Sequence, residues 1–154
     1  MANRADPNST GIAANVDRVL RRIGRYASAW QAPSIRDHSL HQRDWERICA
    51  HAQHYGRDAS KIQRMQTVHL VLSEDASVIG EAYGRAVGKD FDDPSTRNRY
   101  LSGSAAQIIE DLHQRAELGI DRIILTPVSD DVGQLDRWVA EVIKPLNRLL
   151  ANPG

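Results

Sequence analysis

The sequence has no apolar run that approaches the roughly 20 residues needed for a membrane-spanning helix. It has a single cysteine, Cys49, which excludes an internal disulfide and gives no support to an oxidising compartment. The residues after Met1 lack the apolar segment of a secretory signal. We therefore expect a cytoplasmic protein without a membrane partner, in which Cys49 packs within a helix.

An excess of charge of either sign is also missing. The 20 basic residues balance the 20 acidic ones, and neither kind forms a long block, which disfavours a nucleic-acid partner. A small molecule or another polypeptide is the expected partner. The sequence contains no glycine-rich nucleotide fingerprint, no Walker pattern and no serine-centred nucleophile elbow, so it assigns no catalytic residue.

The first part of the chain predicts a loop followed by two helices. Residues 1–11 are polar and are expected to be a flexible terminus, and residues 12–15 form a short apolar step that Asn15 closes as a helix cap. Apolar residues at helical spacing then predict a helix from Val16 to about Trp30. After a polar connector, a second helix is expected to begin at Asp44 and to end at Gly56.

The second part alternates strands with helices. Residues 65–72 are a short apolar run that predicts a buried strand, and residues 120–126 predict a second strong strand. Ser73 is expected to cap the helix after the first strand, and residues 89–103 to be irregular. Because helical crossovers join parallel strands, we expect Gln66–Leu72 and Arg122–Thr126 to be parallel neighbours in an α/β fold.

Two further helices complete this pattern. Ser104 and Gln107 form a capping-box pattern that opens a helix ending at Gly119. Asp131 and Gln134 suggest the start of the last helix, which is expected to be kinked or shortened at Pro145, whose ring cannot continue regular helical bonding.

Three segments carry a resemblance to a known family. The first has a Gly-Ser turn before a helix and a Gly-Ile-Asp step before a strand, within residues 101–127. The second is the small-residue turn and arginine-rich helix of residues 12–30, and the third is the helix of residues 45–58 with its Gly-Arg-Asp end. In this order and spacing they resemble the luciferase-like monooxygenases, which are flavin- or deazaflavin-dependent oxidoreductases. The resemblance covers about residues 12–150.

The resemblance implies a (β/α)8 TIM barrel of which this chain holds only the closing, C-terminal strands and helices. A full barrel takes about 250 residues, so we expect a partial barrel over residues 12–150 with a tail at residues 151–154. Ala13-Ala14 and Ser28-Ala29 stand where the family commonly has Gly-Gly and Asp-Gly. The open sheet edges of a half-barrel need cover. A homo-oligomer or a complementary N-terminal half-barrel chain could supply it, and otherwise the chain is expected to be marginally stable.

The resemblance also implies a cofactor, either FMN or the deazaflavin coenzyme F420, held at the carboxyl ends of the strands. The matching positions here are Ala13, Ala14 and Asn15, Ser73 and Glu74, and Arg99. Backbone N–H groups at a helix start and an arginine side chain both suit a phosphate. Equally, Asn15 and Ser73 can be simple helix caps, and Arg99 a solvated loop residue.

Four histidines form two H-x-x-H spacings, at positions 38, 41, 51 and 54, but no further ligand completes a set, and we expect no metal. His69 either packs in the core or projects into the barrel. Two functions remain open. The chain is a flavin- or deazaflavin-dependent oxidoreductase acting on a small organic substrate, or a non-catalytic half-barrel that serves as an assembly subunit or remnant. In both cases the chain alone is expected to bind the cofactor weakly, if at all.

Overall fold

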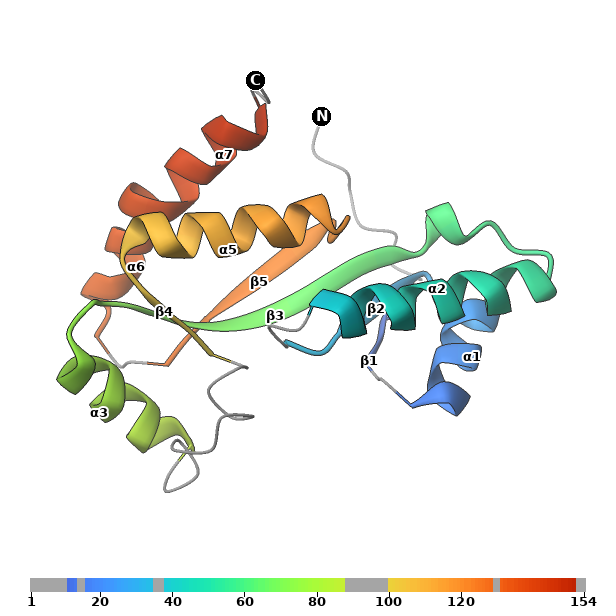
Figure 1. Cartoon of the computed structure of the whole chain (residues 1–154), viewed down its shortest axis with the longest axis horizontal. Helices are drawn as coiled ribbons and strands as arrows, with labels where there is room; N and C mark the ends of the chain where they lie inside the picture. The colour runs from blue at the N-terminus through green and yellow to red at the C-terminus, as the bar shows by residue number, and fades with distance from the viewer. Residues whose placement is uncertain (1–10, 14–15, 35–37, 88–99, 129–130, 152–154) are drawn as a thin grey trace. The chain divides into compact units, whose positions relative to one another are not determined.

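The structure is a computed structural model, and it describes residues 11–13, 16–34, 38–87, 100–128 and 131–151 (Figure 1). The chain divides into two compact units, which are described one at a time. Unit 1 comprises residues 1–67 and 120–123, and unit 2 comprises residues 68–119 and 124–154. Strands β3 (Gln63–Leu72) and β5 (Arg122–Pro127) contribute residues to both units.

Unit 1 consists of parallel strands with connecting helices. Its elements are β1 (Gly11–Ala13), α1 (Asp17–Tyr26), β2 (Ala29–Ala32), α2 (His38–His54), the 3-10 turn η1 (Ala59–Lys61) and the start of β3. Strand β2 pairs in parallel with β1 on one side and with β3 on the other. Helix α1 connects β1 to β2, and helix α2 lies between β2 and β3 in the chain, so these elements follow a βαβαβ path.

Strand β5 lies on the side of β3 that faces away from β2. The backbone N–H of Gln63 donates to the carbonyl of Ser28, at 2.9 Å, before β2. The next residue, Arg64, bonds in the opposite direction: its N–H donates to Oδ2 of Asp121 at 2.7 Å, and its carbonyl accepts from the Asp121 N–H at 2.9 Å. Because successive residues of a strand direct their backbone groups to opposite sides, the strand order at this end is β1, β2, β3, β5.

The core of unit 1 joins the two helices to β2. Trp30 is fully buried and its ring stacks on His41, at 4.9 Å between centroids, and on Trp45, at 6.1 Å. Arg57 closes the end of α1, because its guanidinium donates to the carbonyls of Ile23, Gly24 and Ala27. The Gly-Arg-Asp segment after α2 thus has a structural role. The other buried members of this core are Leu20, Ile23, Ala27, Ala32, Ile48, Ala52 and Ile62.

Unit 2 carries the remaining elements. After β3 come α3 (Ala76–Val87), β4 (Tyr100–Gly103), α5 (Ala105–Glu117), β5, α6 (Gly133–Arg137), the π-helical segment η3 (Trp138–Ile143) and α7 (Lys144–Ala151). Strand β4 pairs in parallel with the end of β3, from His69 with Tyr100 to Leu72 with Gly103. Figure 1 shows α3 and α5 on opposite sides of β3.

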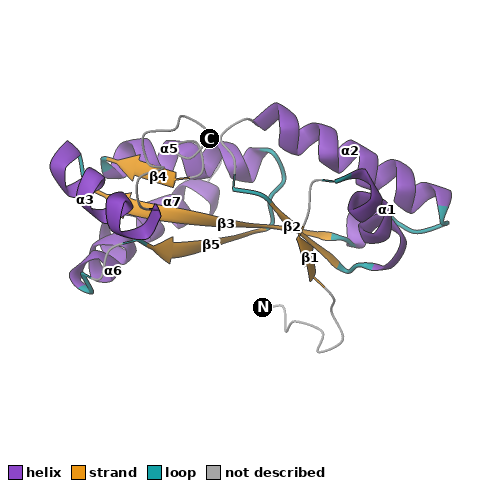
Figure 2. Ribbon diagram, turned by 90° about the horizontal axis from the view of Figure 1, so that it is seen from below, coloured by secondary structure: helices purple, strands orange, loops and turns teal. Residues whose placement is uncertain are grey.

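Several predictions from the sequence are confirmed. Strands β3 and β5 pair with each other, and their arrows point the same way in Figure 2, within an α/β fold with a parallel sheet. The Ser104 hydroxyl accepts from the Gln107 N–H while Oε1 of Gln107 accepts from the Ser104 N–H, which completes the predicted capping box. A π-helical segment lies ahead of Pro145, and α7 continues past the proline to Ala151, so the last helix is not shortened at Pro145. None of the described helices is long and apolar enough to cross a membrane.

Two predicted boundaries near β2 are wrong. The first helix ends at Tyr26 rather than near Trp30, and Ala29–Ala32 is a strand. The helical spacing of apolar residues runs on through this segment, but hydrogen bonds to a strand on each side outweigh it. The second helix begins at His38, not at Asp44, so a polar stretch expected to be a connector is helical.

Two predictions at the carboxyl end of β3 also need correction. Tyr100–Gly103, expected to be irregular, is strand β4. Helix α3 is capped by Asp75 rather than by Ser73, because Oδ1 of Asp75 accepts from the N–H groups of Ser77 and Val78. The pairing of β3 with β4 explains this shift, since a bridge between Ser73 and Gly103 holds Ser73 at the strand end.

Candidate cofactor site at the carboxyl end of strand β3

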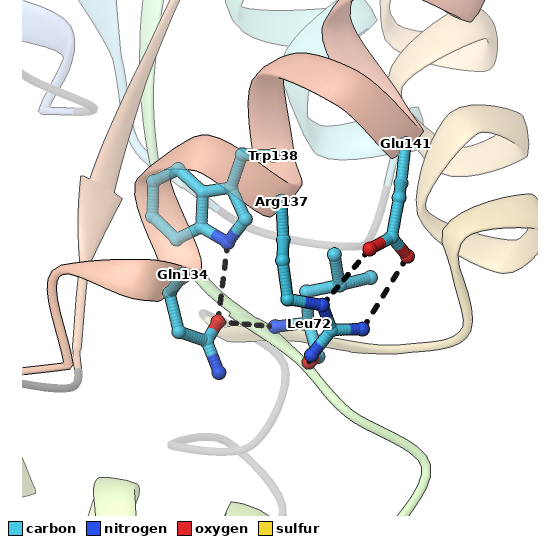
Figure 3. A network of polar contacts seen from close by, with 5 residues as sticks. All are labelled: Leu72, Gln134, Arg137, Trp138 and Glu141. Carbon is cyan, nitrogen blue, oxygen red and sulfur yellow. Dashed lines mark hydrogen bonds and ion pairs between the residues drawn. The ribbon is translucent and has the colours of Figure 1, made fainter.

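A buried glutamine amide joins the last residue of β3 to the C-terminal helix (Figure 3). Oε1 of Gln134 accepts from the backbone N–H of Leu72 at 3.1 Å and from the indole N–H of Trp138 at 3.2 Å. Gln134 and Trp138 are both buried. The first bond satisfies the backbone N–H of Leu72 at the strand end and ties α6 to it.

Arg137 brings a positive charge to the same strand end. Its guanidinium lies 3.4 Å from the Leu72 carbonyl and pairs with Glu141, at 2.9 Å between Nε and Oε1, as Figure 3 shows. This hydrogen bond raises the pKa of Arg137 and lowers the pKa of Glu141. The Arg137 side chain is 51% exposed, so an anion in solution can reach it.

Ser73 and Glu74, predicted to contact a cofactor, follow directly after this strand end. The Ser73 hydroxyl accepts from the N–H of Asp75 at 3.1 Å, and Glu74 is exposed. The carboxylate of Asp75 already occupies N–H groups at the start of α3, which are the groups that bind a phosphate at a helix terminus. The first turn of α3 is therefore poorly suited to a phosphate, and Ser73 has a hydroxyl but no helix-capping role.

The structure tests little of the other predicted contacts. Ala14, Asn15 and Arg99 lie outside the described residues. Ala13 is the last residue of β1, in unit 1. The structure thus places only Ser73 and Glu74 next to each other at one strand end.

His69 is half-buried in an aromatic cluster of unit 2. Its ring lies 5.3 Å from the ring of Tyr100, which in turn lies 4.8 Å from Tyr83. The hydroxyl of Tyr83 donates to the Leu101 carbonyl, so α3 is fastened to β4. The same face of β3 carries Val71, which is fully buried in a cluster with Ala82 and Tyr83 of α3. These residues form a largely aromatic wall at this end of β3.

The four helical histidines do not gather into a ligand set. His41 packs against Trp30, and His51 lies 3.6 Å from Asp17. Across the described ranges, no group of three or more histidine, cysteine or acidic residues is placed to hold a metal ion.

No protein-family model matches the chain, and no curated protein matches it. Solved structures do. An F420-dependent secondary alcohol dehydrogenase, in complex with an F420-acetone adduct, aligns with a TM-score of 0.69 over 92% of this chain and 48% of its own, at 17% identity. A riboflavin lyase with modified FMN and riboflavin aligns with a TM-score of 0.69 over 90% of this chain and 42% of its own, at 15% identity.

A shorter relative aligns as well. A protein described as flavoprotein 390 aligns with a TM-score of 0.62 over 94% of this chain and 67% of its own, at 12% identity. Identities this low establish the fold alone. The chain has a partial luciferase-like TIM-barrel fold and spans about half the length of the first two structures. The fold expected from the sequence is confirmed.

Sequence reasoning missed the two residues that define the strand end. The sequence pattern places Gln134 at a helix start and does not single out Arg137. Gln134, Arg137 and Trp138 share one face of a helix at spacings of three and four residues, a signal that can be found in the sequence. The hydrogen bond between Gln134 and Leu72 joins residues 62 positions apart, so it leaves no local pattern in the sequence.

Proposed function

We propose that this chain forms part of a flavin- or deazaflavin-dependent oxidoreductase that acts on a small organic substrate, including by monooxygenation. The observation that carries the proposal is the alignment of about nine-tenths of the chain with barrels whose descriptions name F420 or FMN. Ligands of such barrels bind at the carboxyl ends of the strands. In unit 2, β3 and β4 both end where Gln134 and Arg137 lie.

The residues present fit one edge of such a cofactor. The Ser73 hydroxyl can donate to a phosphate oxygen, and the Arg137 guanidinium can pair with the phosphate charge. Glu74 and Asp75 oppose this attraction. The bound cofactor would supply the two-electron chemistry. The chain's own part is to hold the phosphate edge and to shield it with the wall of His69, Tyr100 and Tyr83. Ala13, Ala14, Asn15 and Arg99 remain proposed contacts.

Titration with FMN, followed by its fluorescence, tests this proposal. The chain alone supplies part of the enclosure that a cofactor needs, so we expect weak binding, far from submicromolar. Arg137→Gln should weaken FMN binding by about tenfold, because it removes one charged hydrogen-bonding partner. It should leave riboflavin, which lacks the phosphate, unaffected. Arg85→Gln is the matched control, because Arg85 is 57% exposed and also pairs with a glutamate one helical turn away.

The outcomes separate the possibilities. Equal effects of both substitutions, or an equal loss of riboflavin binding, would remove Arg137 from the site. Submicromolar saturation by either FMN or F420 would show a working cofactor enzyme rather than a fragment. The second candidate function is a non-catalytic assembly subunit, and one observation favours it. Helix α3 packs on Val71, on the face of β3 that also carries His69, so protein rather than a cofactor covers part of this strand end. The absence of FMN and F420 binding at any protein concentration would support it.

A further inference from the structure

Three strands of the described sheet, β1, β4 and β5, each pair with a single neighbour and have an open outer edge. Strand β1 pairs with β2, and β5 pairs with β3, and no other described strand pairs with the outer side of either. The open backbone groups of β1 and β5 are a template for pairing with another strand. Parallel strands are normally buried on both faces, whereas along β5 no residue is buried. By contrast, residues 70–72 of β3 are almost completely buried.

Exposed apolar side chains gather on two outer segments: the first βα segment, which is β1 with α1, and the last βα segment, which is β5 with the helices that follow it. Among the described residues, the middle elements β2, α2, β3 and α5 expose no large hydrophobic side chain. The first βα segment exposes Val16 and Tyr26, at the two ends of α1. The last βα segment exposes Ile124, Val132, Leu135, Val139, Leu149 and Leu150. Apart from Val78 on α3, the exposed large apolar side chains of the described residues lie at these edges of an open sheet, which indicates that the edges are covered by protein.

The charges of these two outer βα segments are complementary. Helix α1 carries four exposed arginines, at positions 18, 21, 22 and 25, against one acidic residue, Asp17. Residues 131–143 carry three exposed acidic groups, Asp131, Asp136 and Glu141, against Arg137. In a barrel the helix after the last strand lies next to the helix after the first. The acidic groups of residues 131–143 in one chain therefore meet the arginines of α1 in another when the last βα segment of the first chain lies beside the first βα segment of the second.

We propose that two copies of this chain close one barrel, in which β5 of each copy pairs in parallel with β1 of the other. Of the five strands in each copy, β1, β2, β3 and β5 would supply half of the eight strands of a (β/α)8 barrel, and β4 pairs only with the end of β3. The two contacts are identical and close under a two-fold axis, so the assembly stops at a dimer. The proposal does not depend on cofactor binding.

Sedimentation velocity on the whole chain, at concentrations from about 1 to 100 µM, is the first test. We expect a dimer of twice the 17.2 kDa chain mass. Ile124→Asp, which puts a carboxylate in the interface, should raise the dimer dissociation constant by at least about 100-fold. Val78→Asp on α3 is the control, because Val78 is 42% exposed and Ile124 is 41% exposed. A monomer throughout, or equal effects of both substitutions, would overturn the proposal.

Cross-linking tests the pairing itself and does not depend on a disruptive substitution. In a Cys49→Ser background, one chain carries Ile12→Cys or Ala13→Cys on β1, and another carries Ile124→Cys on β5. Neighbouring strands bring such cysteines within disulfide range. We expect a covalent dimer in the mixture and none from either chain alone. A disulfide between two Ile124→Cys chains would show that two β5 edges meet instead, and would refute the closed barrel.

Discussion

Gly24 offers the sharpest test of how closely the two helices of unit 1 pack. A methyl group at this position would lie 2.7 Å from Cβ of His51, 2.8 Å from the backbone N of Ala52 and 2.9 Å from the carbonyl O of Ile48. Two of these atoms belong to the backbone and the third is attached to it. No flexible side-chain end can move aside, so the substitution must separate α1 from α2.

The expected size follows from two opposing effects. Alanine is favoured over glycine within a helix by about 1 kcal/mol, and overpacking a core costs about 1–3 kcal/mol. Because backbone atoms are in the way, we expect the clash to dominate, and Gly24→Ala to lower the free energy of unfolding by about 1–2 kcal/mol. Gly80→Ala and Gly84→Ala in α3 meet no atom within 4 Å. They should raise it by up to about 1 kcal/mol.

Urea unfolding of the three variants measures these differences, since the midpoint shifts at constant slope when only stability changes. Fluorescence of Trp30 and Trp45 reports on unit 1, and Trp138 reports on unit 2. The opposite signs are the critical result. If Gly24→Ala stabilises unit 1 as much as the α3 substitutions stabilise unit 2, the close approach of α1 to α2 is refuted.

Three further predictions concern charged and titratable groups. Asp111→Asn should cost about 3 kcal/mol in thermal unfolding experiments, because the nearly fully buried Arg115 loses its carboxylate partner, whereas replacing both by apolar residues should restore most of the stability. The hydrogen bond from Arg137 lowers the pKa of Glu141, so its stabilising effect is present above the ordinary glutamate pKa and is lost as the pH falls through the lowered value; Glu141→Gln should remove this part of the acid dependence of unfolding. Partial burial raises the pKa of the Cys49 thiol, so its alkylation should stay slow until the pH exceeds the pKa of an ordinary thiol. Fast reaction at neutral pH would contradict this half-buried setting.

Local chemistry made part of the fold predictable from the sequence. The capping box of α5 involves residues three positions apart, so Ser104 and Gln107 reveal it without knowledge of the rest of the chain. Strand β3 was predictable because its apolar run is too short for an independent helix. Strand β2 was not, because its four residues continue a helical apolar pattern and become a strand only through pairing with β1 and β3.

The candidate site shows the same division. Ser73, Glu74 and Asp75 all suit a helix start, and the sequence alone favours the first of them. The bridge from Ser73 to Gly103 moves the helix start to Asp75, and that contact spans 30 positions of the chain. The sequence indicates only that Gln134 lies at a helix start. Its bond to Leu72 depends on the tertiary fold, so no local pattern predicts it.

The π-helical segment η3 sets the rotation of everything that follows it. Gln134, Trp138 and Val142 are buried at steps of four residues, although an α-helix returns to the same face every 3.6 residues. A wider turn compensates for that drift, and it also suits Pro145, which has no N–H to offer the carbonyl four residues before it.

One residue more or less in this segment therefore changes an angle rather than breaking a helix. Deletion of the exposed Ala140 would convert the wide turn to an ordinary one and rotate the remaining helix by about 100°. Leu149 and Leu150, exposed on α7, would then face another direction, while the buried amide of Gln134 would keep its place. The orientation of the last apolar surface of the chain is thus encoded in the length of a single helical turn.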